Sequence, residues 1–275
     1  MKLEVLMRFI RVLSITPAVH DWLANTRRPH ILHVFDKACN LINEQREVLA
    51  IVTPQIGNGP FNAVLAGQIL ISENLRVESP VSILNDQLII GEINISLSDA
   101  KCWSPCPDWQ ILHNNLDSIA RQLAALPVPD VQLPNSLRSG FPLALASRDI
   151  STSMSIASQL AGAGTGLTPA GDDYILGALY AAWIIYPMET AKVFGIEISN
   201  TAAPLTTSLS AAWLRSAGRG EAGILWHKFF SALLHSNFKQ IRYTMDQILA
   251  TGATSGSDAL AGFIGTFLAY LEMRN

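Results

Sequence analysis

The sequence predicts an α+β protein, in which a β-rich N-terminal part of barrel or sandwich type is followed by an α-helical C-terminal part. From residue 31 to about residue 106, short apolar or alternating runs are bounded by Asn, Gly and Pro, a pattern typical of strands and turns. From residue 109 onward, apolar residues recur at spacings of three and four, as in amphipathic helices. We therefore expect two domains, residues 1–108 and residues 109–275.

The β-rich part begins with a predicted hairpin. The segments HVFDKACNLI and EVLAIVTP lie on either side of a polar turn at residues 43–46. The later segments NLRVESPVSIL and QLIIGEINISL continue the strand-like pattern.

The helical part begins with a predicted helix at residues 109–126, which is followed by a proline-rich connector at residues 127–142. Further helices are predicted at residues 150–160, 172–186, 201–217, 221–234, 238–249 and 258–272.

Composition excludes several classes of protein. The 19 Lys and Arg do not exceed the 22 Asp and Glu, so the basic surplus that nucleic-acid binding requires is missing. Hydrophobic residues make up 49% of the chain and charged residues 15%, which predicts a large core and favours a subunit interface, hence an oligomer.

No membrane partner or disulfide framework is predicted. The longest uncharged apolar run, residues 174–188, is too short for a comfortable membrane span and contains Gly177 and Pro187, so we expect a buried helix there. The three cysteines are sparse and odd in number, which fits a reducing cytoplasm.

The most informative segment is GAGTGLTPAGDD, residues 162–173. Its four glycines permit positive φ and a close backbone approach to a ligand. Thr168 is predicted to cap the following helix, and Pro169 suits the first helical position. The segment therefore predicts a glycine loop that leads into a helix N-terminus, where free backbone N–H groups can bind an anion.

Two known nucleotide loops do not fit this segment. Gly166 and Gly171 have the spacing of a Walker loop, but Asp172 and Asp173 stand where Lys and Ser or Thr are required. A dinucleotide fingerprint fails because Leu167 replaces its third glycine. What remains is a small-anion site whose carboxylates accept hydrogen bonds from a substrate or hold Mg²⁺.

A structural explanation of the same segment stays open. An Asp at a helix N-terminus is favoured by the helix dipole alone, by about 0.3–1 kcal/mol. The glycines can also serve close helix packing.

A second segment, GATSGSDALAG at residues 252–262, repeats part of the first. Both segments have the pattern Gly, any residue, Asp, three residues, Gly where a loop enters an apolar helix. This predicts two similar helix starts that face one pocket. The matching residues are Gly171, Asp173 and Gly177 in the first segment and Gly256, Asp258 and Gly262 in the second.

Two further segments offer binding groups. In GNGPFN, residues 57–62, Asn58 and Asn62 can supply amide donors, although an ordinary turn explains the same residues. At the end of the predicted helix 201–217, Arg215 and Arg219 can reach an anionic substrate, although solvation of a helix end explains Arg215 better.

Metal and serine-nucleophile chemistry find little support. Cys102, Cys106 and His113 lack a fourth ligand and the spacing of zinc sites. Ser255 has no paired histidine in any motif. We therefore assign catalytic roles to Asp172, Asp173 and Arg219, and substrate binding to Asn58, Gly59, Asn62, Gly164, Thr165, Gly166, Thr168, Gly171, Ser255, Gly256 and Asp258.

Four segments together resemble a bacterial family of formerly unknown function that includes the AllH-type subunit of oxamate carbamoyltransferase, which acts in allantoin degradation. These segments are GNGP after the early hairpin, the GLTPAGDD block before its helix, the Thr- and Ser-rich helix that ends in Gly-Arg-Gly-Glu, and the late G-x-T-S-G-x-D-x-L-x-G. The resemblance covers about residues 34–271.

The resemblance implies a cytoplasmic transferase of purine catabolism, acting with companion subunits in the exchange of oxalurate and phosphate for oxamate and carbamoyl phosphate. These substrates are small, anionic and rich in amide N–H. The glycine loop would bind the phosphate or carboxylate, Asp172 and Asp173 would accept from ureido or amide nitrogen, and Arg219 would neutralise charge. Such chemistry depends on positioning and electrostatic stabilisation, so no conventional nucleophile is required.

Two other functions remain compatible with the residues. One is a Mg²⁺-dependent hydrolase that collects Asp172, Asp173 and Asp258 around the metal. The other is a non-catalytic binding or assembly subunit, in which the glycine loops shape an interface.

Overall fold

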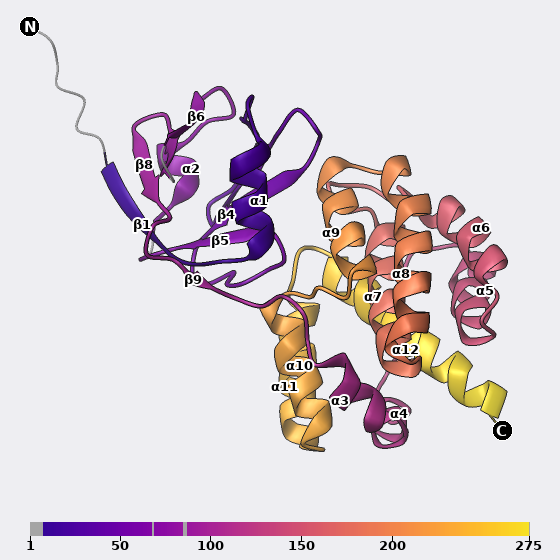
Figure 1. The fold of residues 1–275 in the computed structure, drawn as a ribbon. Helices are drawn as coiled ribbons and strands as arrows, with labels where there is room; N and C mark the ends of the chain where they lie inside the picture. The colour runs from indigo at the N-terminus through magenta and orange to yellow at the C-terminus, as the bar shows by residue number, and fades with distance from the viewer. Residues whose placement is uncertain (1–7, 68, 85–86, 275) are drawn as a thin grey trace, which may run out of the picture. The chain divides into compact units, whose positions relative to one another are not determined.

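The computed structural model describes residues 8–67, 69–84 and 87–274. The chain divides into an N-terminal unit, Met1–Pro105, and a C-terminal unit, Cys106–Asn275 (Figure 1). The first is β-rich and the second helical, which confirms the predicted α+β class. Each unit is described on its own below.

The strands of the N-terminal unit form one nearly closed, barrel-like sheet in the order β2-β3-β4-β5-β1-β8-β7-β6, with β9 paired to β1. Two helices accompany it, α1 (Pro17–Asn25) and α2 (Ile71–Asn74). The strands are β1 (Arg8–Ile15), β2 (His30–Val34), β3 (Ala38–Ile42), β4 (Val48–Val52), β5 (Asn62–Leu65), β6 (Val81–Leu84), β7 (Gln87–Ile90), β8 (Ile93–Ser96) and β9 (Lys101–Cys102).

The predicted hairpin is present as the antiparallel pair β3 and β4. Asn43 closes its turn, because its side-chain oxygen accepts the N–H groups of Gln45 at 3.1 Å and Glu47 at 2.8 Å. The segment HVFDKACNLI, however, is not one strand: it turns after Val34 and forms a second hairpin, β2 with β3.

The sequence patterns did not predict β1, although it lies inside the sheet between β5 and β8. Its buried residues are Ile10, Val12 and Ile15, while Arg8 and Arg11 are exposed. The two arginines therefore interrupt the apolar run in sequence but lie outside the core in space.

The C-terminal unit contains ten α-helices among the described residues and a short 3₁₀ turn at Ala203–Leu205. The helices are α3 (Trp109–Asn114), α4 (Leu116–Leu123), α5 (Asn135–Ala146), α6 (Ile150–Leu160), α7 (Ala170–Ile185), α8 (Met188–Ala202), α9 (Ser208–Gly218), α10 (Ile224–Leu234), α11 (Phe238–Leu249) and α12 (Ser255–Arg274).

Three predictions about these helices were wrong. The helix expected at residues 109–126 is broken at Asn115 into α3 and α4. Helix α8 was not expected at all. The connector expected at residues 127–142 instead contains the start of α5, with Pro142 inside the helix.

A neighbouring side chain compensates for Pro142. A proline has no N–H group, so the carbonyl of Arg138, four residues earlier, loses its helical partner. The hydroxyl of Tyr174 on α7 donates to that carbonyl at 2.6 Å. Helix α5 therefore continues through the proline because α7 supplies the missing hydrogen bond.

Helix α7 is the central element of the C-terminal unit, since every residue from Gly171 to Ile185 is buried. This agrees with the buried helix expected from its apolar sequence. In the described part of the chain, no helix is both long enough and apolar enough to cross a membrane.

Helices α7 and α12 pack together through a reciprocal pair of glycines. A Cβ atom on Gly177 would lie 1.7 Å from the carbonyl oxygen of Ala259, and one on Gly262 would lie 2.0 Å from that of Tyr174. Since Tyr174 and Ala259 follow Asp173 and Asp258, each helix presents the same two positions to the other. The close backbone approach therefore sets how both aspartates are placed.

The preceding glycines of the two segments also make matching contacts. A Cβ atom on Gly171 would lie 2.0 Å from the carbonyl oxygen of Leu160, at the end of α6. One on Gly256 would lie 1.8 Å from that of Ile248, near the end of α11. The repeated pattern in the sequence thus corresponds to two similar helix pairs, α6 with α7 and α11 with α12.

We expect Gly262→Ala to lower the free energy of unfolding by about 1–3 kcal/mol, because the new methyl group overpacks the backbone of Tyr174. Gly265→Ala is the matched control on the same helix, since its Cβ atom meets nothing closer than the Tyr174 hydroxyl at 3.4 Å. That change should be neutral or stabilising by up to about 1 kcal/mol. Urea unfolding measures both, and equal stabilities of the two variants would refute the packing argument.

Candidate functional site

The glycine loop before α7 is tied down at both ends by polar side chains. Asp172 Oδ1 accepts the N–H of Gly162 at 2.9 Å, and its Oδ2 accepts the hydroxyl of Thr206. The carbonyl of Leu167 accepts the hydroxyl of Thr207 at 2.7 Å. The residues just before α9 therefore hold the loop in place, and Asp172 links the start of the loop to Thr206 through its two carboxylate oxygens.

Burial raises the pKa of Asp172, while its bonds from Thr206 and Gly162 favour the ionised form. Both carboxylate oxygens are thus engaged inside the protein. The catalytic role assigned to Asp172 from sequence remains a prediction, and the geometry favours an indirect version of it, in which Asp172 positions the loop.

Between these anchors, Gly164, Thr165, Gly166 and Leu167 are exposed. Gly164 has a φ of 121°, and a Cβ atom there would lie 2.7 Å from the amide nitrogen of Ala170, so this position requires glycine. No described residue accepts a hydrogen bond from the amides of Thr165, Gly166 or Leu167. The loop therefore presents unused N–H groups to solvent, as an anion cradle does.

The start of α7 itself differs from the prediction. The helix begins at Ala170 after Pro169, without a side-chain cap, and Thr168 is not the capping residue. The N–H groups of Gly171, Asp172 and Asp173 already donate to the carbonyls of Ala163 and Pro169. The free donors of this region are consequently those of the loop rather than those of the helix end.

Thr168 instead contacts the second segment. Its hydroxyl lies 2.8 Å from the hydroxyl of Ser255, the first residue of α12. Both hydroxyls lie close enough to Asp173 to favour its ionised form. The structure thus brings Thr168, Asp173 and Ser255 together from positions up to 87 residues apart.

Asp173 is the most perturbed carboxyl group of this cluster. Its side chain is 8% exposed, and Oδ2 has no hydrogen-bond partner. Burial, followed by repulsion from Asp258 and Asp172, raises the pKa of Asp173 to about 8. A carboxyl group with such a pKa can hold or release a proton near neutral pH, which is typical of acid–base groups at functional sites.

Asp258 lies near the same cluster. It is 2% exposed, and its Oδ2 also has no partner. Burial raises the pKa of Asp258, while the hydroxyl of Thr254 opposes the shift. Gly256, two residues earlier, is buried against α11 and serves packing.

Arg219 lies elsewhere. It follows α9, and its guanidinium group binds both carboxylate oxygens of Glu221, at 3.0 and 2.7 Å. The carbonyl of Ala217 beside it accepts the indole N–H of Trp183, in the last turn of α7. The rise of a helix separates Trp183 from Asp172 by about 16 Å. Arg219 is therefore paired with Glu221 and remote from the aspartates, and its catalytic role stays a prediction.

Asn58, Gly59 and Asn62 belong to the N-terminal unit, where they build a self-contained turn. Asn58 Oδ1 accepts the hydroxyl of Ser14 at 2.6 Å, and the side-chain amide of Asn62 donates to the carbonyl of Gly57 at 3.0 Å. A Cβ atom on Gly59 would lie 2.7 Å from Asn62 Nδ2. These contacts give the residues a structural role, and their binding role stays a prediction.

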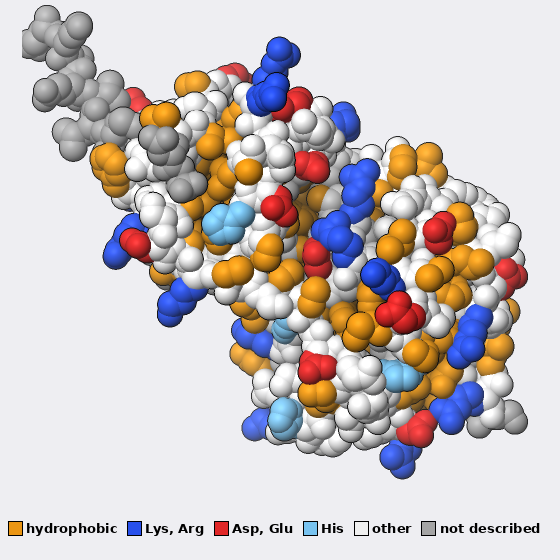
Figure 2. Space-filling view, viewed as in Figure 1, with side chains coloured by type: hydrophobic (Ala, Val, Ile, Leu, Met, Phe, Trp, Pro, Cys, Tyr) orange, Lys and Arg blue, Asp and Glu red, His pale blue; other side chains and the backbone are white. Residues whose placement is uncertain are grey.

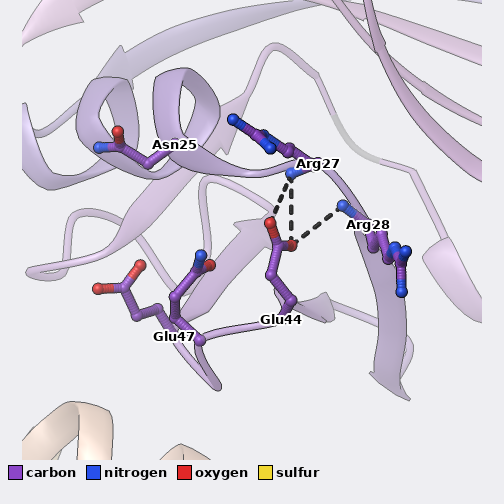
Figure 3. Close-up of a pocket in the computed structure, with 6 residues that line it drawn as sticks. Asn25, Arg27, Arg28, Glu44 and Glu47 are labelled. Carbon is purple, nitrogen blue, oxygen red and sulfur yellow. Dashed lines mark hydrogen bonds between the residues drawn. The ribbon is translucent and has the colours of Figure 1, made fainter.

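Two surface hollows lie away from the aspartates. One, of about 660 Å³, lies beside α1; there Glu44 accepts the backbone N–H groups of Arg27 and Arg28, whose side chains point away from each other (Figure 3). The other, of about 540 Å³, lies between α5 and α12 and is mainly apolar. Neither is lined by Asp172, Asp173 or Asp258.

Three polar residues of this region were missed from sequence. They are Thr206, whose hydroxyl donates to Asp172, and Ser210 and Thr254, whose hydroxyls favour the ionised forms of Asp172 and Asp258 and so lower their pKa values. Thr206 and Ser210 approach the loop only in the folded chain, so no spacing in the sequence identifies them as partners of Asp172. For a metal, the described residues offer no group of three or more His, Cys, Asp or Glu side chains placed to hold one.

The raised pKa of Asp173 predicts a pH-dependent stability. The unfolded chain releases this proton near pH 4, whereas the folded chain retains it up to about pH 8. The free energy of unfolding should therefore fall as pH rises through this window, by about 1.4 kcal/mol per pH unit. In Asp173→Asn this contribution should be lost.

Urea unfolding between pH 5 and 7 measures the difference in slope. Asp246→Asn is the control, because Asp246 is an exposed aspartate on α11. Equal slopes for the wild type and Asp173→Asn would show that Asp173 is ionised in the folded protein.

Comparison with protein families supports the resemblance seen in the motifs. Residues 11–102 match the AllH family N-terminal domain, and residues 160–267 match a family described as oxamate carbamoyltransferase subunit AllH. No solved structure matches the chain. Neither family match supports the hydrolase or the purely structural alternative. The chain belongs to the AllH family and is a carbamoyltransferase-like subunit, which implies companion subunits.

Proposed function

We propose that this subunit binds the substrates of the oxalurate and phosphate exchange at the glycine loop and Asp173. The observation that carries the proposal is the pairing of two features in one place. Buried Asp173 keeps one carboxyl oxygen without a partner, and exposed loop amides without partners lie just before its helix. Unused hydrogen-bonding groups of opposite kind suit a ligand that is both anionic and rich in N–H.

The loop is the anion-binding half of the proposed site. Its amides at Thr165, Gly166 and Leu167 supply several N–H donors without a side-chain charge. Asp172 and Thr207 hold the loop in place from behind. A preformed loop loses little conformational entropy on binding, which suits a phosphate or carboxylate group.

Asp173 is the nitrogen-binding half. A carbamoyl or ureido group presents N–H donors, and the free oxygen of Asp173 can accept one of them. The hydroxyls of Thr168 and Ser255 lie beside it and can take the carbonyl side of the same group. Together they would hold the carbamoyl group next to the phosphate, so that transfer depends on positioning and not on a protein nucleophile.

The companion subunits supply the positive charge. Binding of a phosphate anion favours nearby cations, but Arg219 is paired with Glu221, and the charged groups that act on Asp173 among the described residues are Asp258 and Asp172. Figure 2 shows hydrophobic side chains exposed among charges of both signs on the face in view. Large apolar residues such as Met188, Val193 and Leu205 are about half exposed in the C-terminal unit, which is suitable for subunit contacts.

We also place this reaction in the cytoplasm. The three cysteines, Cys39, Cys102 and Cys106, are all free thiols, as a reducing compartment favours.

The test is an assay of carbamoyl phosphate formation from oxalurate and phosphate by the chain assembled with its companion subunits. Asp173→Asn should lower turnover at least about 100-fold, because the amide cannot exchange a proton as the carboxyl group does. Asp246→Asn, a matched change at an exposed position, should retain full activity. Wild-type activity of Asp173→Asn in a folded complex would reject the site, and an inactive wild-type complex would reject the reaction.

A further inference from the structure

Asp173 and Asp258 are equivalent positions of the two similar helix pairs. Each lies two residues after a glycine packed on the preceding helix, and four residues before a glycine packed on the other helix of the pair α7 and α12. Each is more than nine-tenths buried, and each keeps Oδ2 without a hydrogen-bond partner. Two carboxyl groups are therefore enclosed next to the same helix contact, both incompletely bonded.

The surroundings of this pair contain acids and hydroxyls. Asp172 on α7 and Asp258 on α12 are the charged groups that act on Asp173, and both are acidic. Thr168, Ser255 and Thr254 contribute hydroxyls. Among the described residues, no charged group on the other helices packed against α7 and α12 interacts electrostatically with Asp173. Two carboxylates in such a place repel each other, and water does not screen them, so one proton bound between them relieves the repulsion.

We propose that Asp173 and Asp258 hold one proton between them at neutral pH and deliver it to the nitrogen atom that leaves when the carbamoyl group is transferred. The first half of the proposal rests on the burial of both side chains, their unpartnered oxygens and their matching places beside the contact of α7 and α12. The second half rests on the proposed function.

The proton balance of the transfer fits one shared proton. A phosphate oxygen forms a bond to the carbamoyl carbon of oxalurate, and the bond from that carbon to the oxamate nitrogen breaks. The departing nitrogen takes the proton of the carboxyl pair, which makes oxamate a neutral amide at that end. The pair regains a proton from hydrogen phosphate as carbamoyl phosphate forms. No further acid, base or redox partner is needed, and the pair ends in its starting state.

Infrared spectroscopy of the full-length chain tests the shared proton without any assay of activity. A protonated carboxylic acid has a C=O stretch separate from that of a carboxylate. We expect wild-type protein at pH 7 to show this acid band and to lose it above pH 8. Asp173→Asn should remove the band at pH 7. Asp258→Asn should move its titration to lower pH, because the neighbouring charge is gone. Asp246→Asn should leave the band unchanged.

Several outcomes would overturn the proposal. One is a wild-type spectrum at pH 7 without the acid band, a result that needs no variant to fold. Another is an unchanged titration in Asp258→Asn, which would make the two carboxyl groups independent. Loss of the band on addition of Mg²⁺ would show that the pair binds a metal instead. If the band behaves as expected but the assembled enzyme makes no carbamoyl phosphate, the proton pair stands and the proposed reaction fails.

Discussion

The backbone contact between α7 and α12 determines where the polar groups of the C-terminal unit lie. Gly177 and Gly262 let the two helices approach to a separation that no side chain would permit. The contact encloses Asp173 and Asp258, and it joins the loop before α7 to the start of α12 through the hydroxyls of Thr168 and Ser255. Without this approach the carboxyl groups would be solvated, and their pKa values would be ordinary. The close packing of the two helices is therefore also what gives the carboxyl groups of the site their raised pKa values.

Two adjacent aspartates take different parts in this arrangement. Successive residues of a helix point about 100° apart, so Asp172 and Asp173 face different neighbours. Asp172 faces α9 and the loop, and its two carboxylate oxygens accept hydrogen bonds from Gly162 and Thr206. Asp173 faces α12 and keeps an oxygen free. The first residue shapes the loop, and the second, in our proposal, meets the substrate. The glycines divide in the same way, since Gly164 shapes the exposed loop while Gly171 and Gly177 serve packing.

Much of this architecture follows from local sequence. The α+β class, the hairpin of β3 and β4, and the glycine loop before a buried helix were all predictable, because periodicity and turn residues report local structure. The matching segments at Gly171 and Gly256 were also visible in the sequence. Contacts between residues distant along the chain were not predictable from local sequence. The Thr168 hydroxyl contacts Ser255 and does not cap α7. Arg219 binds Glu221, far from the aspartates. The expected connector around Pro142 was wrong for a similar reason. The Tyr174 hydroxyl donates to the carbonyl of Arg138, and this hydrogen bond lets α5 continue through the proline.

The central claim is that the loop and Asp173 form one binding site for a small anion that carries N–H groups. Titration of the full-length chain with oxamate, followed by backbone amide NMR, tests it most directly. The account predicts shifts in the amides of Thr165, Gly166 and Leu167 that saturate together with shifts at Thr168 and Ser255, and that are lost in Asp173→Asn. Saturating shifts confined to other parts of the chain, with none in the loop, would contradict it.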